Sequence, residues 1–398
     1  MSKLEEIKTS EASLEGLGVD MSSNGDAGAS RTGIRSEELA INFGPQHPSA
    51  HGVFRAIFHV DGEVITKIEP KIGYLHRCFE KIAENRTYTQ FIPYTDRMDY
   101  VSSMLNNWAY VLTVEKLAGI EVPERAEYIR VIVGELQRIA SHLVFLTTAG
   151  VETGAVTPYM YYFDEREQIL NLFEGVCGAR LTYNYMRIGG VSADLPDGWL
   201  EDTKVFLKRL VKTMDETDKL LLGNYIFKKR MIGMVPFTAE DALKWGLTGP
   251  SLRAAGVPYD VRKDDPYSVY PRIDFDVCTR SNCDNYDRAS IRSDEIRQCI
   301  RIIEQAIEQI PDGPVKAEGI AKVFKPAEGE AYGHVEASRG DLGFYIVSDG
   351  TTKPYRVKIQ GPSFGNLQAL PAMAEGSYFG DVILAFGTLD TVFGEVDR

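Results

Sequence analysis

Apolar residues recur at every second position near both ends of the chain and at every third or fourth position between them. Near the N-terminal end, the alternating segments FRAIFHV and EVITKIEP lie on either side of an Asp-Gly dipeptide. Such a dipeptide favours a tight turn, so a β-hairpin is predicted over 54–69. LGFYIVS and TTKPYRVKI flank a second Asp-Gly dipeptide and predict another hairpin over 342–359. Each end of the chain therefore contributes a small β unit.

The middle part of the chain has the apolar spacing of helices from Phe79 onwards. Gly119 ends one expected helix, and Pro123 suits the first position of the next. The acidic pair at 164–165 suits the positive end of a helix dipole and predicts the start of a third helix. The main helices are expected at 101–119, 124–150, about 164–186, about 200–222 and 293–310. The helical core then covers about 79–311.

These elements indicate the α+β class, predominantly α, with a long-helix bundle and small β units from the N- and C-terminal ends. Residues 1–37 are polar and rich in small side chains, which predicts a flexible arm before a single domain over 38–398. We expect few charges on the inner faces of the long helices, which would suit burial against partners. The sequence has no internal repeat and no glycine-rich nucleotide loop.

The charge balance argues against nucleic-acid binding. The 398 residues include 44 Lys and Arg against 57 Asp and Glu, a formal net charge of −13, whereas nucleic acids require a basic surface. No segment approaches the roughly 18 consecutive apolar residues that span a bilayer. The N-terminus has no apolar core and does not resemble a signal peptide, so the chain is expected to stay in the cytoplasm.

The five cysteines are expected to be reduced thiols, because their number is odd and no secretory signal precedes them. Cys278 and Cys283 are the closest pair in the sequence. Their spacing is looser than that of most zinc sites, and no second pair would complete four ligands. The cysteines therefore predict no metal site.

The segment NFGPQHPSAHG places His47 and His51 four positions apart. On a helix, this spacing would put both rings on one face and suggest a metal pair. Pro45, Pro48 and Gly52 interrupt the backbone, however, so a loop is predicted instead. A histidine on a loop is either a hydrogen-bonded structural residue or a titratable group at a site. The residues alone leave both interpretations open.

Several motifs in a fixed order resemble one protein family. They are GPQHPSAHG (44–52), YTDRMDYVS (94–102), TPYMYYFDERE (157–167), GARLTYNYMRIGGV (178–191) and DTVFGEVDR (390–398). Together they resemble the hydrogenase-like large subunits of NADH-quinone oxidoreductases, which form the D-subunit family of respiratory complex I. The resemblance covers roughly residues 38–398 and implies the fold of the nickel–iron hydrogenase large subunit.

Nickel–iron hydrogenases hold their metal pair with two Cys-x-x-Cys motifs. The matching regions here are LHRCFEK (75–81), which has only Cys78, and LDTVFGEVDR (389–398), which has no cysteine. Because such a centre needs thiolate ligands, the nickel–iron site cannot form, and an active hydrogenase is excluded. The resemblance implies a fold that has lost its metal and kept the cavity.

The family uses this cavity to reduce a quinone. Negative charge develops on the quinone oxygens as electrons arrive, so fixed donors that can release a proton stabilise the reduced form. By the match to the family, His51 and Tyr100 are the two headgroup ligands, and His47 lines or supports the site. The family aspartate that holds the histidine corresponds to Glu152, whose longer side chain keeps the charge.

Arg77 and Arg97 match arginines that lie close to the terminal iron–sulfur cluster of a neighbouring subunit in this family. Positive charge beside a cluster favours its reduced form and raises its potential. Many relatives carry a histidine after GGV, where this chain has Ser192. Coupling of cluster reduction to pH through that position is therefore expected to be absent.

The resemblance thus implies a peripheral-arm subunit of a proton-translocating NADH:quinone oxidoreductase, on the cytoplasmic side of the inner membrane. The chain would bind no cofactor of its own: quinone is the substrate, and the iron–sulfur clusters and FMN belong to partner subunits. Those partners are the cluster-bearing subunit, a 30-kDa-like subunit and membrane-arm subunits. The alternative is a non-catalytic scaffold, derived from a hydrogenase, that joins the two arms. The residues do not select the quinone, and the electron donor stays open between NADH, ferredoxin and a deazaflavin.

Overall fold

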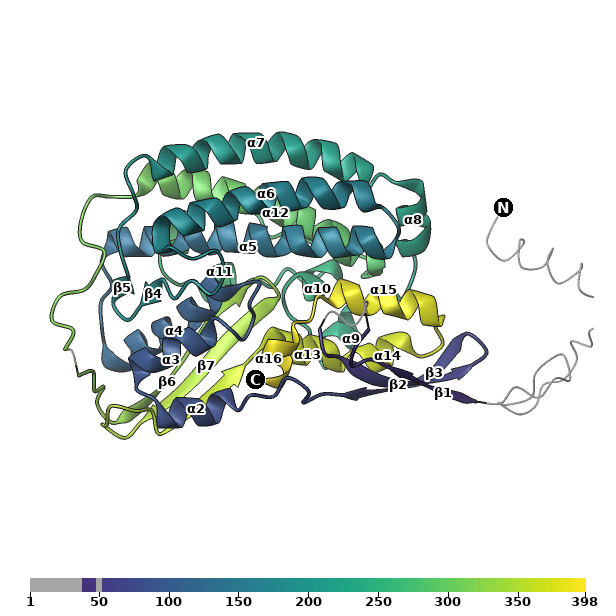
Figure 1. The fold of residues 1–398 in the computed structure, drawn as a ribbon, viewed down its shortest axis with the longest axis horizontal. Helices are drawn as coiled ribbons and strands as arrows, with labels where there is room; N and C mark the ends of the chain where they lie inside the picture. Colours follow the sequence, from purple (N-terminus) through teal and green to yellow (C-terminus); the bar gives the residue numbers. More distant parts are fainter. Residues whose placement is uncertain (1–37, 48–51, 322) are drawn as a thin grey trace, which may run out of the picture.

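The computed structural model of this chain describes residues 38–47, 52–321 and 323–398. Figure 1 shows a bundle of long helices lying above a layer of small sheets and short helices. This arrangement is the predominantly helical α+β fold that the apolar pattern predicts. The expected arm, 1–37, lies outside the described residues.

Four long helices form the bundle. They are α5 (Glu124–Glu152), α6 (Val156–Cys177), α7 (Trp199–Leu220) and α12 (Asn285–Gln309). α5 packs against both α6 and α12, and α7 packs against the same two helices. Because α5 is surrounded in this way, most of its side chains are buried. It is the central helix of the molecule.

Two three-stranded antiparallel sheets lie below the bundle. The N-terminal sheet has the order β1 (Leu39–Phe43), β2 (Arg55–Asp61), β3 (Val64–Lys71). The C-terminal sheet has the order β6 (Gly329–Ala337), β7 (Gly340–Ser348), β8 (Arg356–Gln360). The two expected hairpins correspond to β2–β3 and β7–β8, whereas β6 was not anticipated. A pair of two-residue strands, β4 (Met186–Arg187) and β5 (Gly190–Val191), completes the β structure of the described residues.

Shorter helices connect these parts. They are α2 (Phe79–Asn85), α3 (Tyr88–Thr95), α4 (Ser103–Ala118), α8 (Tyr225–Met231), α9 (Ala239–Lys244), α10 (Gly249–Ala254), α11 (Val261–Asp264), the 3-10 helix η2 (Tyr270–Arg272), α13 (Pro362–Gln368), α14 (Leu370–Ala374), α15 (Phe379–Leu389) and α16 (Phe393–Asp397). α4 packs across β6 and β7, and α15 contacts α5 and α12. The C-terminal sheet is thereby joined to the bundle.

The expected start and end of the third helix are wrong. α6 begins at Val156, well before the acidic pair, and ends at Cys177 because Gly178 takes a left-handed conformation with φ +73°. Asp164 and Glu165 lie in the middle of the helix and form ion pairs with Arg209 of α7. Their charge therefore serves helix packing and not the helix dipole.

Two other helix starts also differ from the sequence pattern. α12 begins at Asn285 and not near 293, because the Asp284 carboxylate caps it by accepting the N–H of Asp287 at 2.7 Å. Pro123 is the residue before the first turn of α5 and not its first residue. In contrast, α4 ends as expected, with Gly119 at φ +64°.

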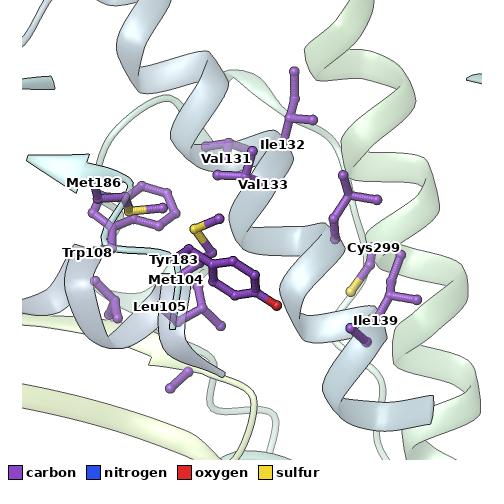
Figure 2. Close-up of a cluster of buried hydrophobic side chains, with 14 of the residues drawn as sticks. Met104, Leu105, Trp108, Val131, Ile132, Val133, Ile139, Tyr183, Met186 and Cys299 are labelled. Carbon is purple, nitrogen blue, oxygen red and sulfur yellow. The ribbon is translucent and has the colours of Figure 1, made fainter. Parts of the chain in front are cut away.

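An apolar core fills the space between α4, α5 and α12. Figure 2 shows its members, which are Met104, Leu105 and Trp108 from α4, Val131, Ile132, Val133 and Ile139 from α5, Cys299 from α12, and Tyr183 and Met186 from the segment after α6. Trp108 is fully buried and lies edge-on to Tyr267, with ring centroids 5.2 Å apart. Burial of each such side chain contributes about 1.5–3 kcal/mol, so this core holds the bundle on the C-terminal sheet.

A second apolar cluster joins the two ends of the chain. The Phe54 ring stacks on Phe386 with centroids 4.6 Å apart and on Phe393 with centroids 5.2 Å apart. Phe43 of β1 lies edge-on to Phe58 of β2 in the same cluster. The N-terminal sheet is therefore packed against the C-terminal helices.

The expectation of few charges on the inner helix faces is wrong. The buried charged or titratable side chains of α5 and α12 include Arg130, Glu135, Arg138, His142, Arg288, Arg292 and Glu295. Glu135 accepts hydrogen bonds from Arg262 at 2.9 and 3.1 Å, from Arg138 at 3.1 Å and from Tyr270 at 2.6 Å. Although burial opposes it, Arg138 and Arg262 lower the pKa of Glu135, so this buried carboxyl stays ionised.

Replacing Glu135 with Gln tests this ion network. The substitution leaves Arg138 and Arg262 buried without their shared counter-charge, so the free energy of unfolding should fall by about 3–5 kcal/mol. Urea denaturation of the isolated chain measures it. The control is Glu240→Gln in the exposed pair with Lys244, whose side chains are 79% and 63% exposed. It should change stability by no more than about 0.5 kcal/mol. Equal effects of the two substitutions would contradict the network.

Candidate functional site

The turn between α3 and α4 carries Tyr100 and is fixed on both sides of it. The Ser103 hydroxyl donates to the Asp96 carbonyl at 2.8 Å, and the Asn106 amide donates to the Asp99 carbonyl at 3.0 Å. The Asp99 side chain accepts the N–H of Val101 at 3.1 Å. These bonds hold the backbone of the DRMDYVS motif, so the Tyr100 side chain leaves the turn in a defined direction.

Tyr100 is half-buried, and its surroundings keep the phenol protonated. Burial raises the pKa of Tyr100 above its ordinary value, and the neighbouring Asp99 carboxyl raises it further. The charges of Arg339 and Arg77 lower the pKa of Tyr100 by a smaller amount. A phenol in this state is a hydrogen-bond donor that can give up its proton to a stronger base formed beside it.

The structure brings both predicted arginines to the same place. Arg77 donates from Nη2 to the Arg97 carbonyl at 2.7 Å, and its guanidinium lies 4.7 Å from the centroid of the Phe79 ring. Both arginines are exposed, and the charge of Arg77 acts on Tyr100. Arg77 therefore lies on the surface near the tyrosine, and the exposed Arg97, whose Nη1 donates to the Pro93 carbonyl at 2.5 Å, lies three residues before it.

His47 follows β1 on an open cavity of about 500 Å³. The other described lining residues are Pro45, Gln46, Gly52, Val53 and Tyr74. The His47 ring is exposed and lies 4.4 Å from the centroid of Phe43. His51, the first predicted headgroup ligand, lies outside the described residues. Of the two histidines of the motif, the structure therefore describes His47, which the sequence predicts to line or support the site.

The C-terminal helix α16 packs against both Gly52 and the Tyr100 turn. A side-chain carbon at Gly52 would come within 3.6 Å of the Phe393 ring, and one at Gly394 would come within 2.4 Å of the Met98 carbonyl. α16 therefore contacts the histidine loop through one residue and the tyrosine turn through the next. The last motif of the sequence joins the first two.

Glu152 lies farther away, as the last residue of α5, and is half-buried. Ser141 of the same helix accepts a hydrogen bond from Arg339 at 3.2 Å, next to the Tyr100 turn. The eleven helical positions from 141 to 152 span roughly 16 Å. Glu152 therefore lies about three helical turns from the residue of α5 that contacts Arg339.

The structure also shows a buried ionic cluster beside Tyr100 that the sequence did not reveal. Arg339, in the β6–β7 turn, donates to the Asp99 carboxylate at 2.6 Å and to the Asp390 carboxylate at 3.1 Å. Although burial opposes them, these two carboxylates and the buried Glu395 of α16 raise the pKa of this arginine. The cluster members are far apart in sequence, so no motif spacing could predict it.

The remaining sequence candidates lie apart from this cluster. Ser192 is half-buried and donates its N–H to the Tyr185 carbonyl at 2.9 Å. Burial raises the pKa of Cys278 to about 12, which makes this thiol a poor metal ligand. Among the described residues, no group of three or more histidine, cysteine, aspartate and glutamate side chains is arranged to hold a metal ion.

Comparison with known sequences identifies the family. The family described as "Respiratory-chain NADH dehydrogenase, 49 Kd subunit" matches residues 152–326 and 318–398. The D subunit of the NADH-quinone oxidoreductase of Clostridium beijerinckii is 54% identical over 92% of this chain and 98% of its own length. The D subunits of the same enzyme from Carboxydothermus hydrogenoformans and Desulforamulus reducens are both 52% identical over 92% of this chain. They are covered over 100% and 99% of their own lengths.

This chain belongs to the 49 kDa subunit family of the respiratory-chain NADH dehydrogenase. The family membership that the motifs predicted is thereby confirmed. In this member of the 49 kDa family, none of the helices in the described ranges combines the length and apolar composition needed to cross a bilayer.

Gly394→Ala tests the contact between α16 and the Tyr100 turn. The new methyl group would lie 2.4 Å from the Met98 carbonyl, so α16 must move and the free energy of unfolding should fall by about 1–3 kcal/mol. The matched control is Gly380→Ala in α15, where a side-chain carbon meets nothing within 4 Å. Urea denaturation should show no loss for the control. A tolerated Gly394→Ala would contradict the close packing of α16.

Proposed function

We propose that this chain forms one wall of the quinone-reducing chamber of an NADH:quinone oxidoreductase. The observation that carries the proposal is the protonated Tyr100 phenol, held on a rigid turn that α16 connects to the His47 loop. Relatives that are 50–54% identical over nearly their whole length are named as the D subunit of NADH-quinone oxidoreductase. The geometry of the Tyr100 site and the names of the relatives thus support the same function.

The proposed chemistry needs two electrons and two protons for each quinone. As electrons arrive, negative charge develops on the quinone oxygens, and a fixed hydroxyl aimed at one of them stabilises that charge. Tyr100 supplies this hydroxyl, and His51 is the proposed donor to the other oxygen. His47 lines the chamber, and Glu152 orients the histidine ring. None of these roles requires a metal or cofactor held by this chain.

The electrons come from partner subunits in this proposal. The exposed pair of Arg77 and Arg97 faces the terminal iron–sulfur cluster of a neighbouring subunit, where positive charge favours the reduced cluster. The direct partners are the cluster-bearing subunit and a 30-kDa-like subunit. NADH is oxidised, and FMN is bound, by other subunits of the assembly. The assembly joins membrane-arm subunits at the cytoplasmic side of the inner membrane and couples quinone reduction to proton translocation.

Tyr100→Phe tests the proposal in the assembled complex. The change removes one hydroxyl and little volume, so assembly should persist while NADH-driven quinone reduction falls at least tenfold. Loss of one donor in comparable sites costs roughly 10²–10³ in rate. Tyr355→Phe, at a tyrosine that is 69% exposed, is the matched control and should keep full activity. Unchanged turnover in the Tyr100 variant would favour the non-catalytic scaffold.

Arg97→Gln tests the position of the neighbouring cluster. Removal of one positive charge beside it should lower its midpoint potential by on the order of 50 mV, measured by redox titration of its electron paramagnetic resonance signal. Arg230→Gln, on the exposed last turn of α8, should leave the potential unchanged. Because this chain has Ser192 where the resemblance implies a histidine in many relatives, the potential should also show little dependence on pH. An unaltered midpoint potential in Arg97→Gln would show that Arg97 does not lie beside the cluster.

A further inference from the structure

We propose that the buried carboxyl cluster of Asp99, Asp390 and Glu395 around Arg339 holds one exchangeable proton and returns it to Tyr100 after each quinone reduction. The inference rests on the proposed function and adds to it the source of the tyrosine's replacement proton. It assigns a role to the carboxyl groups behind the tyrosine, which the headgroup chemistry leaves unexplained.

The carboxyl groups of the cluster outnumber its cations. The cluster contains three carboxyl groups: Asp99 and Glu395 are buried, 2% and 1% exposed, and the Asp390 side chain is partly buried, 12% exposed. Arg339 contacts two of them directly, and its Nε also donates to the Asp390 carbonyl at 2.6 Å. A second cation, Arg292 of α12, lies 3.7 Å from Asp390. Three ionised carboxylates would exceed the two cations, and an excess buried charge is avoided by binding a proton.

Arg292 is shared between two carboxylates. The Asp390 and Glu295 carboxylates both act on its charge, and its guanidinium also stacks 3.9 Å from the Phe145 centroid. Its fully buried Nε and Nη2 atoms make no hydrogen bond to the described part of the chain, and neither does Asp390 Oδ2. The support that Arg292 gives Asp390 is therefore partial, which strengthens the case for a retained proton.

Glu395 is the carboxyl with the least cationic support. Its Oε2 accepts the N–H of Ser363 at 3.0 Å, and Gly361 packs so closely against it that a side-chain carbon there would lie 2.6 Å from the Glu395 Cγ. Burial, followed by the Asp99 charge, raises the pKa of Glu395 to about 7. Burial also raises the pKa of Asp99 despite Arg339. Because the Asp99 charge acts on Glu395, we assign the retained proton to this pair of carboxyls and not to one of them alone.

The charged and titratable groups that face the cluster come from several elements. They are Arg339 of the β6–β7 turn, Arg292 of α12 and Tyr100 of the α3–α4 turn, with Arg77 and Glu295 beyond them. Tyr100 follows Asp99 directly in the chain and responds to its charge. One carboxyl of the pair that holds the proton therefore belongs to the residue directly before the proposed donor to quinone.

The proton moves in two transfers. The Tyr100 O–H bond breaks as its proton passes to a quinone oxygen that has received electrons from the partner's iron–sulfur cluster, which leaves a phenolate. The O–H bond of the carboxylic acid then breaks, the phenol O–H re-forms, and a carboxylate is left in the cluster. Because the pKa of Tyr100 is raised above that of an ordinary phenol, this second transfer is favourable. A proton from water restores the carboxylic acid. Glu395 acts through Tyr100 and is a positioning and proton-storing residue.

Glu395→Gln in the assembled complex tests the inference through the pH profile of quinone reduction. Wild-type turnover should fall as pH rises through about 7, because the stored proton is lost above that value. The glutamine variant cannot store a proton, so its turnover should be about tenfold lower near pH 6 and flat through this range. Glu395→Asp keeps a carboxylic acid, so its turnover should again fall as pH rises. Glu375→Gln, an exposed carboxyl on the same C-terminal segment, should match the wild type.

A second measurement does not depend on turnover. The infrared spectrum of the wild-type complex, minus that of Glu395→Gln, should contain a carbonyl band of a protonated carboxylic acid that disappears as pH rises through about 7. Absence of this band would overturn the inference. If Glu395→Gln fails to assemble, Asp99→Asn takes its place in the difference spectrum. A wild-type turnover profile without a step near pH 7 would overturn the inference in either case.

The outcomes separate the inference from the proposed function. Full activity in Tyr100→Phe would refute the proposed function and the inference with it. Loss of activity in Tyr100→Phe, together with wild-type turnover and a wild-type pH profile in Glu395→Gln, would refute the proton store alone.

Discussion

The pairing of Arg339 with carboxylates is the interaction on which the site depends. A buried guanidinium needs counter-charges, and this one takes them from Asp99 before α4 and Asp390 after α15, while also donating to Ser141 of α5. The β6–β7 turn, the bundle and the C-terminal helices must therefore meet at one point. Tyr100 lies at that point, so the arginine that completes the fold also fixes the proposed donor to quinone.

The local parts of the fold could be predicted from the sequence because their causes are local. Alternation around Asp-Gly dipeptides corresponds to β2–β3 and β7–β8, and Gly119 ends α4 as its conformational freedom predicts. The start of α6 could not be predicted in this way, because Asp164 and Glu165 bind an arginine of α7 that is distant in the sequence. The buried charges of α5 and α12 were missed for the same reason, since compensation by Arg262 and Arg253 appears only in three dimensions.

The candidate site could be predicted only where its residues lie within sequence motifs. The DRMDYVS and LHRCFEK segments gave Tyr100, Arg77 and Arg97, and the structure places these three together. His47 lines a cavity next to the same C-terminal helix, whereas the position of His51 lies outside the described residues. The carboxyl cluster could not be found from spacing, because Asp99 and Arg339 are 240 positions apart. The raised pKa of Glu395 could not be predicted either, because it depends on burial of the carboxyl group in the folded chain.

The most direct test of the account is a structure of the assembled complex with a quinone or a quinone-site inhibitor bound. We expect the Tyr100 hydroxyl to lie about 2.7–3.0 Å from a headgroup oxygen, with the His51 ring on the other side of the same headgroup. A headgroup bound elsewhere, with the Tyr100 phenol enclosed by packed side chains and sharing no cavity with His51, would contradict it.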